Sequence, residues 1–462
     1  MNIYLSIIYL VSTITFITGL KLLGHPETAK KGNQIAASGM GLAIVGTILL
    51  HELEVPGFIY GLIAAAIAIG AIIGYVIAVK VKMTKMPELV SLFNGFGGAS
   101  AALIGLVEFG QTSGAISQVV TIVAAISIGS LTFSGSMIAW AKLNGTMWKD
   151  IRLPHYNLIN NVIFLGLILF AAYIVWSGAS GIIIVSLLCL IGLLYGVLLV
   201  IPIGGADMPV VISLLNSLTG IAAAITGILY DNMVMLAGGI LVGSAGLILT
   251  FAMCDAMNRS LINVMFGAFG GGAVAEGDDS HAQTGGTIKK ATVSDVAILM
   301  NYAARVIFVP GYGLAVAQAQ HAIHELEQLL ENRGIEVKYA IHPVAGRMPG
   351  HMNVLLAETN VEYDKLAEME DVNPEFQNTD VVLVVGANDV VNPAARHDTA
   401  SPIFGMPILD VDHAKQIIVN KRTMNPGYAG IDNELFYNQK TSMLFGDAKS
   451  IIQALITELK GM

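Results

Sequence analysis

A glycine motif in the C-terminal third has the spacing of a nucleotide-binding turn. The string GYGLAV at 311–316 follows a β-branched run at 305–309 and precedes an amphipathic stretch at 314–331. In the dinucleotide fingerprint, glycines allow a tight turn and let the backbone approach a pyrophosphate, whose charge is favoured at a helix N-terminus. The strand before this GxGxxV pattern and the helix after it favour a nucleotide site over a chance match.

The ribose of the nucleotide should be held differently from that of NAD. NAD-specific folds usually end the second strand with an acid that holds the ribose 2′-hydroxyl, but the run at 336–342 ends in His342-Pro343. A 2′-phosphate would need cations instead, and Lys421-Arg422 follows the run at 416–420. Such a pair is often only solvated. Its place at the carboxyl end of a strand makes a phosphate site the slightly better interpretation.

These residues require a parallel sheet to position them. Beyond about residue 290, β-branched runs alternate with helical stretches, which is typical of strands joined by crossover helices. The pattern predicts an α/β Rossmann-like domain at 291–462. Its expected strands are 305–309, 336–342, 380–385 and 416–420, and its expected helices include 314–331 and 448–459.

The rest of the chain is too apolar for a soluble protein. Of its 462 residues, 55% are hydrophobic and 12% are charged, and the charges are sparse before about residue 260. A membrane-spanning helix needs about 20 apolar residues. The pattern predicts an α-helical polytopic membrane domain at 1–262 with about nine spans: 3–23, 35–50, 58–79, 89–107, 116–141, 158–176, 181–201, 210–230 and 233–253. A flexible Gly-rich linker is expected at 263–290.

The charges between the expected spans indicate their orientation, because loops rich in Lys and Arg stay in the cytoplasm. The positive residues fall on one side: Lys21, Lys30, Lys31, Lys80, Lys82, Lys85, Lys142, Lys149, Arg152 and Arg259. The other loops carry Glu52, Glu54, Glu108 and Asp231 instead. The N-terminus is therefore expected outside and the C-terminal domain in the cytoplasm.

Charge and cysteine content argue against two other classes of site. The net charge of -9 lacks the basic footprint of a nucleic-acid-binding protein. Cys189 and Cys254 are isolated in apolar stretches, so a disulfide framework or a zinc site is not expected.

Several longer strings carry a family resemblance over essentially the whole chain. In the C-terminal domain they are GYGLAVAQAQ at 311–320, HPVAGRMPGHMNVLLAE at 342–358, GANDVVNP at 386–393 and KRTMNPGYAG at 421–430. In the membrane domain they are MPELV at 86–90, GGADMPVV at 204–211, LNS at 215–217 and AMNRS at 256–260. Together they resemble the beta subunit of proton-translocating NAD(P) transhydrogenase.

The resemblance implies a set of nucleotide contacts. NADP(H) would be bound by Gly311, Tyr312, Gly313, Ala315, Val316, His342, Arg347, Gly386, Asn388, Asp389, Lys421, Arg422, Gly427, Tyr428 and Ala429. Within this set, Asp389 would link the redox state of the nucleotide to protonation, and Gly427, Tyr428 and Ala429 would belong to a loop that closes over it. From the residues alone, Asp389 reads as a turn residue.

The resemblance also implies the activity and the partners. Hydride would pass between NADP(H) on this chain and NAD(H) on an alpha subunit, coupled to proton translocation, with no metal involved. The working unit would be a dimer of alpha-beta units in the bacterial cytoplasmic (inner) membrane. An ion transporter whose Rossmann domain only senses nucleotide is the alternative, and it predicts binding without hydride exchange.

The proton path departs from the family pattern. The family often has a histidine in the fourth span, where this chain has Asn94, which cannot take up a proton near neutral pH. Either a partner's helix against the fourth span supplies the protonatable group, which we favour, or water held by Asn94, Asn216 and Ser244 conducts with Asp207 near the cytoplasmic mouth. Ser244 is better explained as a polar contact between helices, and Asp207 could simply cap a helix. The resemblance places Arg259 at a coupling hinge.

Overall fold

The computed structural model describes residues 3–24, 26–50, 56–111, 115–147, 155–178, 181–203, 207–258, 260–262, 288–348, 350–427 and 429–462. Residue contacts divide the chain into a helical unit, up to Thr250, and a C-terminal unit, to which the short segment 207–210 also belongs, and we describe each by itself. Most of the linker expected at 263–290 lies outside the described residues, so the domain boundaries stay a prediction.

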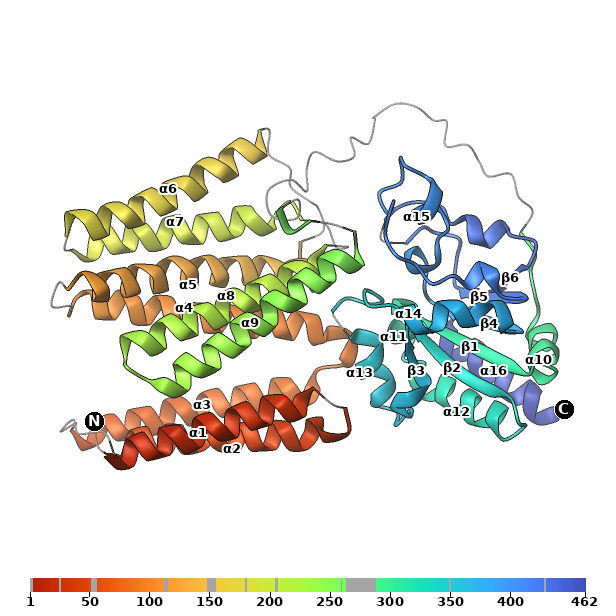
Figure 1. Cartoon of the computed structure of the whole chain (residues 1–462), viewed down its shortest axis with the longest axis horizontal. Helices are drawn as coiled ribbons and strands as arrows, with labels where there is room; N and C mark the ends of the chain where they lie inside the picture. The colour runs from red at the N-terminus through yellow and green to blue at the C-terminus, as the bar shows by residue number, and fades with distance from the viewer. Residues whose placement is uncertain are drawn as a thin grey trace. The chain divides into compact units, whose positions relative to one another are not determined.

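The helical unit is built from long apolar helices (Figure 1). Among the described residues, nine helices are long and apolar enough to cross a membrane. They are α1 (Ile3–Leu23), α2 (Pro26–Leu50), α3 (Gly57–Lys80), α4 (Met86–Phe109), α5 (Ile116–Leu143), α6 (Tyr156–Ser177), α7 (Ile182–Val200), α8 (Met208–Leu229) and α9 (Met233–Ala256). This confirms the predicted polytopic helical architecture.

One expected loop assignment is wrong. Helix α2 begins at Pro26, nine residues before the predicted span, so Lys30 and Lys31 lie in its first turns and not in a loop. A proline is well tolerated at the first helical position, and the polar residues after it form helix without being apolar. Apolarity alone therefore locates the part of a helix that sits in hydrocarbon and misses its polar extension.

Glycines let the helices of this unit pack with their backbones in contact. A Cβ added to Gly98 of α4 would lie 2.7 Å from the carbonyl oxygen of Gly129 on α5. A Cβ added to Gly220 of α8 would lie 2.4 Å from the backbone nitrogen of Gly243 on α9, and one on Gly239 would lie 2.4 Å from that of Ala224. The small residues on the last two of these helices therefore pack against each other.

The C-terminal unit contains a parallel six-stranded sheet in the order β3-β2-β1-β4-β5-β6, which confirms the Rossmann-like prediction. The strands are β1 (Arg305–Pro310), β2 (Glu336–Ile341), β3 (Leu366–Glu368), β4 (Val381–Val385), β5 (Gln416–Lys421) and β6 (Thr441–Phe445). Strands β1, β2, β4 and β5 match the predicted runs to within one residue at either end. Every residue of β4 is buried, as expected for a strand covered on both faces.

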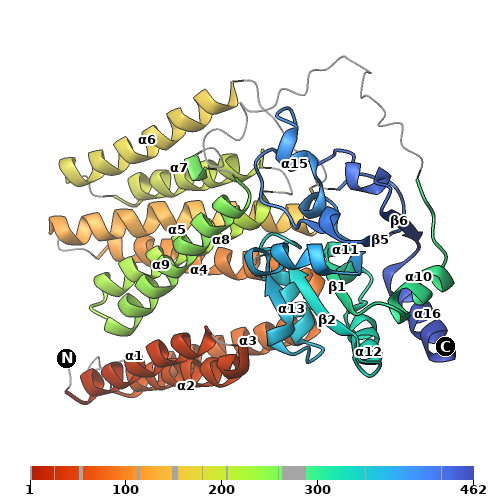
Figure 2. The ribbon, with the colours of Figure 1, turned by 45° about the vertical axis from the view of Figure 1, so that its right-hand side comes forward.

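Helices surround this sheet. They are α10 (Val293–Asn301), α11 (Tyr312–Val316), α12 (Gln320–Glu331), α13 (His351–Ala357), α14 (Met369–Val372), α15 (Ala394–His397) and α16 (Ala448–Gly461). Helices α10 and α16 lie side by side in both ribbon views (Figure 2). The single helix expected at 314–331 is wrong, because Gln318 has a φ of 52° and separates α11 from α12.

A buried carboxylate ties α12 to the sheet. Glu327 has no exposed surface, and its oxygens accept hydrogen bonds from Lys365 Nζ at 2.7 Å, Tyr339 Oη at 2.8 Å and His324 Nδ1 at 2.9 Å. Burial opposes ionisation of Glu327, but these hydrogen bonds outweigh it and hold the pKa of the carboxyl below its ordinary value. The ion is stable inside the protein only because its partners are in place.

Replacing Lys365 by Met is expected to destabilise the C-terminal unit by about 3–5 kcal/mol, because Glu327 is left buried without its cation. Hydrogen–deuterium exchange of the α12 amides in the whole chain measures this free energy of opening. Lys460→Met is the matched control, because Lys460 Nζ lies 2.7 Å from Glu325 on the same helix with both side chains more than half exposed. An exposed pair should contribute only about 0–1 kcal/mol. Equal effects of the two variants would contradict the assignment.

The Glu327 contact also gives stability a defined pH dependence. A carboxyl whose folded-state pKa is lowered contributes stability that is complete above its ordinary pKa of about 4.3. That contribution is lost as pH falls through the lower folded-state pKa. The difference between wild type and Lys365→Met should therefore be constant near neutral pH and shrink only in acid.

Candidate functional site

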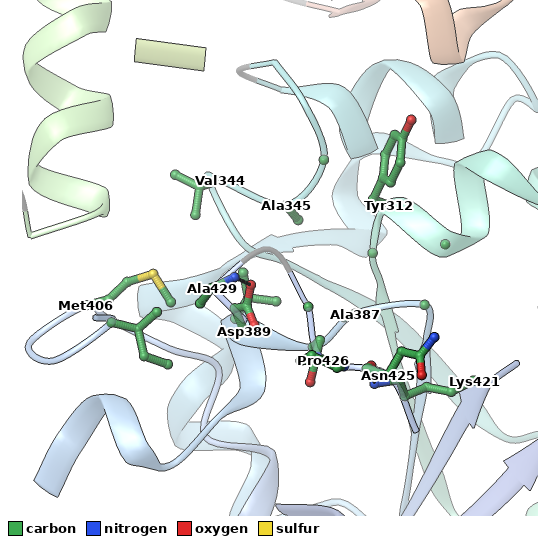
Figure 3. Close-up of a pocket in the computed structure, with 18 of the residues that line it drawn as sticks. Tyr312, Val344, Ala345, Ala387, Asp389, Met406, Lys421, Asn425, Pro426 and Ala429 are labelled. Carbon is green, nitrogen blue, oxygen red and sulfur yellow. Dashed lines mark hydrogen bonds between the residues drawn. The ribbon is translucent and has the colours of Figure 1, made fainter. Parts of the chain in front are cut away.

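A pocket in the C-terminal unit lies where strands β1, β4 and β5 end (Figure 3). Strand β1 is bonded to β4 on one side and to β2 on the other, so the chain order reverses there, and such a switch point is where ligands bind in open α/β sheets. Residues that line the pocket include Gly311, Tyr312, Gly313, Val344, Ala345, Gly346, Gly386, Ala387, Asn388, Asp389, Val390, Ile403, Met406, Lys421, Arg422, Thr423, Asn425, Pro426, Gly427 and Ala429.

Two glycine turns interlock at the base of the pocket. Gly311 N–H donates to the carbonyl of Val385, and Gly313 N–H donates to the carbonyl of Gly386, both at 2.9 Å. A Cβ on Gly311 would lie 2.4 Å from Ala387 Cα, and one on Gly313 would lie 2.6 Å from Gly386 Cα. Gly386 has a φ of +67°, which a side chain rarely adopts. These glycines are needed because the turn after β1 packs directly on the turn after β4.

The rest of the fingerprint does not line the pocket. Ala315 is buried in the domain, and Val316 is 43% exposed. Helix α11 has only five residues before the break at Gln318, so it is much shorter than the helix that was expected to open at this turn. From the fingerprint, only Gly311, Tyr312 and Gly313 line the pocket. The short α11 has a small helix dipole, which would contribute little to binding an anion there.

Asp389 lies against the loop that follows β5. Its Oδ2 accepts a hydrogen bond from Ala429 N–H at 3.0 Å, and a Cβ on Gly427 would lie 2.5 Å from its Oδ1. Figure 3 shows Asp389 and Ala429 next to each other at the pocket wall. Gly427 is thus required for the close approach of this loop to the carboxylate. Tyr428, which was predicted to bind nucleotide with them, lies outside the described residues.

Two buried asparagines, which the sequence reasoning did not identify, hold the same loops together. Asn433 Nδ2 donates to the carbonyl of Asn388 at 2.9 Å and to its Oδ1 at 3.1 Å. Asn392 Nδ2 donates to the carbonyl of Asp432 at 3.0 Å, and its side chain is fully buried. Together they fix the turn that carries Asn388 and Asp389 to the end of the loop after β5. Their only signal in the sequence is their place near the family strings: Asn392 lies within GANDVVNP, and Asn433 follows KRTMNPGYAG by three residues.

Lys421 and Arg422 lie at the carboxyl end of β5, as predicted. Lys421 Nζ donates to the carbonyl of Asn425 at 2.9 Å and lies 4.6 Å from the centre of the Phe436 ring. Burial lowers the pKa of Lys421, and the nearby Asp389 and Asp432 act in the opposite direction. Arg422 is 58% exposed, and its Nε is 3.8 Å from Asp447. Both cations border the pocket, and Arg422 has only a long contact with an acid.

His342 and Arg347 support the pocket wall without lining it. His342 is buried, its Nε2 hydrogen-bonds to the carbonyl of Pro407 at 2.8 Å, and its Nδ1 accepts from Val344 N–H at 3.2 Å. Burial lowers the pKa of His342 to about 4, although the bond to Pro407 opposes this, so the ring is neutral at physiological pH. The Arg347 guanidinium lies over the Tyr312 ring at 4.4 Å. These contacts fix the loop after β2, and a role of His342 in ligand binding stays a prediction.

Metal-ligand residues do not gather in the described part of the chain. There, no three His, Cys, Asp or Glu side chains are placed to hold an ion. Cys189 and Cys254 are free thiols on α7 and α9. The pocket offers a ligand backbone amides, the Asp389 carboxylate and the Lys421-Arg422 pair.

The described residues that were predicted for the proton path do not form one cluster. Asn94 is buried on α4, and its Nδ2 lies 3.5 Å from the carbonyl of Ile212 on α8. Thr219 Oγ1 donates to the Asn94 carbonyl at 3.2 Å. Asn216 is half-buried and Ser244 is exposed. Asp207 is half-buried in the turn before α8, and Arg259 lies outside the described residues.

Other polar groups missed by the sequence reasoning line the same helix contacts. Ser217 Oγ donates to the carbonyl of Gly243 at 2.6 Å, and Ser213 Oγ donates to that of Gly246 at 3.1 Å. Ser91 Oγ donates to the carbonyl of Ser136 at 3.2 Å. Ser217 belongs to the LNS string at 215–217, but serines are common in membrane helices, so nothing in the sequence separates Ser91 and Ser213 from the others.

Comparison with known proteins assigns the whole chain to one family. A family model described as NAD(P) transhydrogenase beta subunit matches residues 5–458. Two sequences of Rhodospirillum rubrum, both named NAD(P) transhydrogenase subunit beta, are each 46% identical to this chain over 97% of both lengths. This relationship and the apolar helices identify an integral membrane protein. The chain belongs to the NAD(P) transhydrogenase beta subunit family.

Proposed function

We propose that the C-terminal unit binds NADP(H) in the pocket at the ends of β1, β4 and β5, and that this nucleotide exchanges hydride with NAD(H) on a partner subunit. The observation that carries the proposal is the position of Lys421 and Arg422 in the same pocket as the glycine turns. A dinucleotide with a 2′-phosphate needs both an open backbone surface and cations. The family name supports a nicotinamide nucleotide as the ligand.

The residues present fit such a nucleotide. The glycine turns leave backbone at the pocket base without side chains, where a pyrophosphate could approach. Lys421 and Arg422 would hold the 2′-phosphate, with Lys421 exchanging its contact with the Asn425 carbonyl for a phosphate oxygen. When bound, the nicotinamide ring supplies the hydride chemistry, and the chain orients it and excludes water.

Asp389 is the residue we propose to connect the nucleotide with protonation. Its carboxylate lies at the pocket wall and accepts a hydrogen bond from Ala429 N–H. A change in the charge of Asp389 would therefore change the strength of the hydrogen bond that fixes the loop after β5. A carboxylate accepts this hydrogen bond strongly and a neutral carboxyl accepts it weakly. Proton occupancy at Asp389 would in this way favour one position of the loop over another.

The other half of the hydride site must come from another polypeptide. The described residues form one Rossmann-like sheet with one such pocket, and a beta subunit implies an alpha partner. We propose that the alpha subunit carries NAD(H) and further membrane helices, and that alpha-beta units pair as a dimer. The distribution of Lys and Arg supports an external N-terminus and a cytoplasmic nucleotide unit in the bacterial inner membrane.

Proton passage would supply the driving force for hydride transfer. One proton crossing about 100 mV releases about 2.3 kcal/mol, which shifts an equilibrium roughly fiftyfold. Asn94 is buried against α8, and the exposed face of α4 carries Phe93, Phe96 and Leu103. A partner's helix on that face would contact these apolar groups, so the position of Asn94 favours the alternative in which water held near α8 conducts.

The nucleotide assignment predicts a selective loss of affinity. Replacing Lys421 and Arg422 together by alanine should weaken NADPH binding by roughly 100-fold, because two charge-assisted contacts are lost, with little effect on NADH. Isothermal titration of the purified chain with each nucleotide measures this. Lys415→Ala is the control, since Lys415 is 65% exposed just before β5, at the strand end away from the pocket. An equal loss for NADPH and NADH would refute the 2′-phosphate site.

The proton route predicts a different phenotype for Asn94. Asn94→Leu should slow proton translocation roughly tenfold, because water beside α8 loses a hydrogen-bonding partner, while NADPH affinity stays at the wild-type value. The measurement compares acidification of vesicles with nucleotide binding. Ser100→Ala, an exposed hydroxyl on the same helix, is the control. Undiminished translocation in Asn94→Leu would show that the route does not use this residue.

A further inference from the structure

The C-terminal end of α7 has a carbonyl that its own helix cannot satisfy. In an α-helix the carbonyl of residue 198 would accept from the N–H of residue 202, but residue 202 is Pro202, which has none. The N–H groups of Ile201 and Ile203 bond to Val197 and Val200, so neither serves Leu198. Leu198 is buried, and an unpaired buried carbonyl is costly, so another donor is required.

Tyr156, in the first turn of α6, supplies that donor. Its Oη donates a hydrogen bond to the Leu198 carbonyl, and both residues are buried. The tyrosine hydroxyl therefore replaces the N–H that Pro202 lacks. This contact joins the first turn of α6 to the last turn of α7.

Lys142, in the last turn of α5, binds two of the carbonyls that follow. Its Nζ donates to the carbonyl of Ile203 at 2.8 Å and also to that of Ile201. A cation is favoured at a helix C-terminus, where carbonyls concentrate negative partial charge. Two donors from two neighbouring helices thus hold three carbonyls of the segment that ends α7.

We propose that Lys142 and Tyr156 form a clamp that fixes the point from which the chain leaves α7 for α8, and that this clamp sets how tightly proton passage is coupled to hydride transfer. Only three residues, 204–206, separate Ile203 from the Asp207 turn before α8. Helix α8 contacts Asn94 through Ile212 and Thr219 and carries Asn216. A loose α7 end would therefore let α8 shift relative to α4. The effect on coupling rests on the proposed function, whereas the clamp itself does not.

Hydrogen exchange tests the clamp without any activity assay. Tyr156→Phe removes one oxygen and keeps the ring, and it should raise exchange of the Ile201 and Ile203 amides about fivefold, as expected for the loss of one hydrogen bond. Lys142→Met should act in the same direction, and Lys142→Arg, which keeps donors, should act less. Tyr173→Phe, at an exposed tyrosine of α6, and Lys80→Met, at an exposed lysine ending α3, are the controls. Unchanged exchange in Tyr156→Phe would overturn the clamp.

Coupling is then measured in vesicles that contain the chain and its alpha partner. The double variant Lys142→Met, Tyr156→Phe should move severalfold fewer protons per hydride than wild type, with the KM for NADPH unchanged. If the clamp has only a structural role, hydride transfer and proton movement should fall in proportion. An unchanged number of protons per hydride would therefore overturn the coupling role. If wild type itself moves no protons, the proposed function fails and the coupling role fails with it, while the exchange result still decides the clamp.

Discussion

The close approach of two backbone turns determines the shape of the C-terminal pocket. The turn after β1 and the turn after β4 touch through Gly311, Gly313 and Gly386, where any added Cβ would lie within 2.6 Å of a backbone atom. Because these turns end neighbouring strands of one parallel sheet, their contact fixes the pocket floor relative to β5. Asp389 and Lys421, at the ends of β4 and β5, are therefore held at a common site although 32 positions separate them in the chain.

The same principle of backbone contact organises the helical unit. Helices α4 with α5, and α8 with α9, meet through glycines and leave serine hydroxyls bonded to carbonyls of the neighbouring helix. Such packing leaves little room for independent motion of single helices. Movement coupled to protons is then expected at helix ends, where side chains and not glycine contacts fix the backbone, as at the end of α7.

Much of this architecture could be predicted from local sequence patterns. The apolar runs located strands β1, β4 and β5 nearly to the residue, because strands buried on both faces are almost continuously apolar. Strand β2 was located as well, although Glu336 and Lys338 interrupt its apolar residues. Strand β3 was missed because its three residues are too few to show a periodic pattern. The break between α11 and α12 was missed because it depends on a positive φ at Gln318, which a glutamine does not predict. The start of α2 was missed because its first turns are polar.

The candidate site could be predicted only where a strand end or the family strings located it. Lys421 and Arg422 were found because they follow a strand, and Gly311 and Gly313 because of their spacing. The role of His342 could not be predicted, since its partner Pro407 is 65 positions away. Asn392 and Asn433 were missed for the same reason: an asparagine that bonds a distant carbonyl resembles any turn residue.

The proposed coupling of hydride transfer to proton translocation can be measured directly. Vesicles containing the chain and an alpha partner, loaded with a pH-sensitive dye, are given NADPH and an oxidised NAD analogue whose reduction is followed by absorbance. We expect reduction of the analogue and acidification of the lumen to occur together, and an uncoupler to abolish acidification but not hydride transfer. Reduction without acidification would contradict the coupling, and nucleotide binding without reduction would indicate a nucleotide-sensing transporter instead.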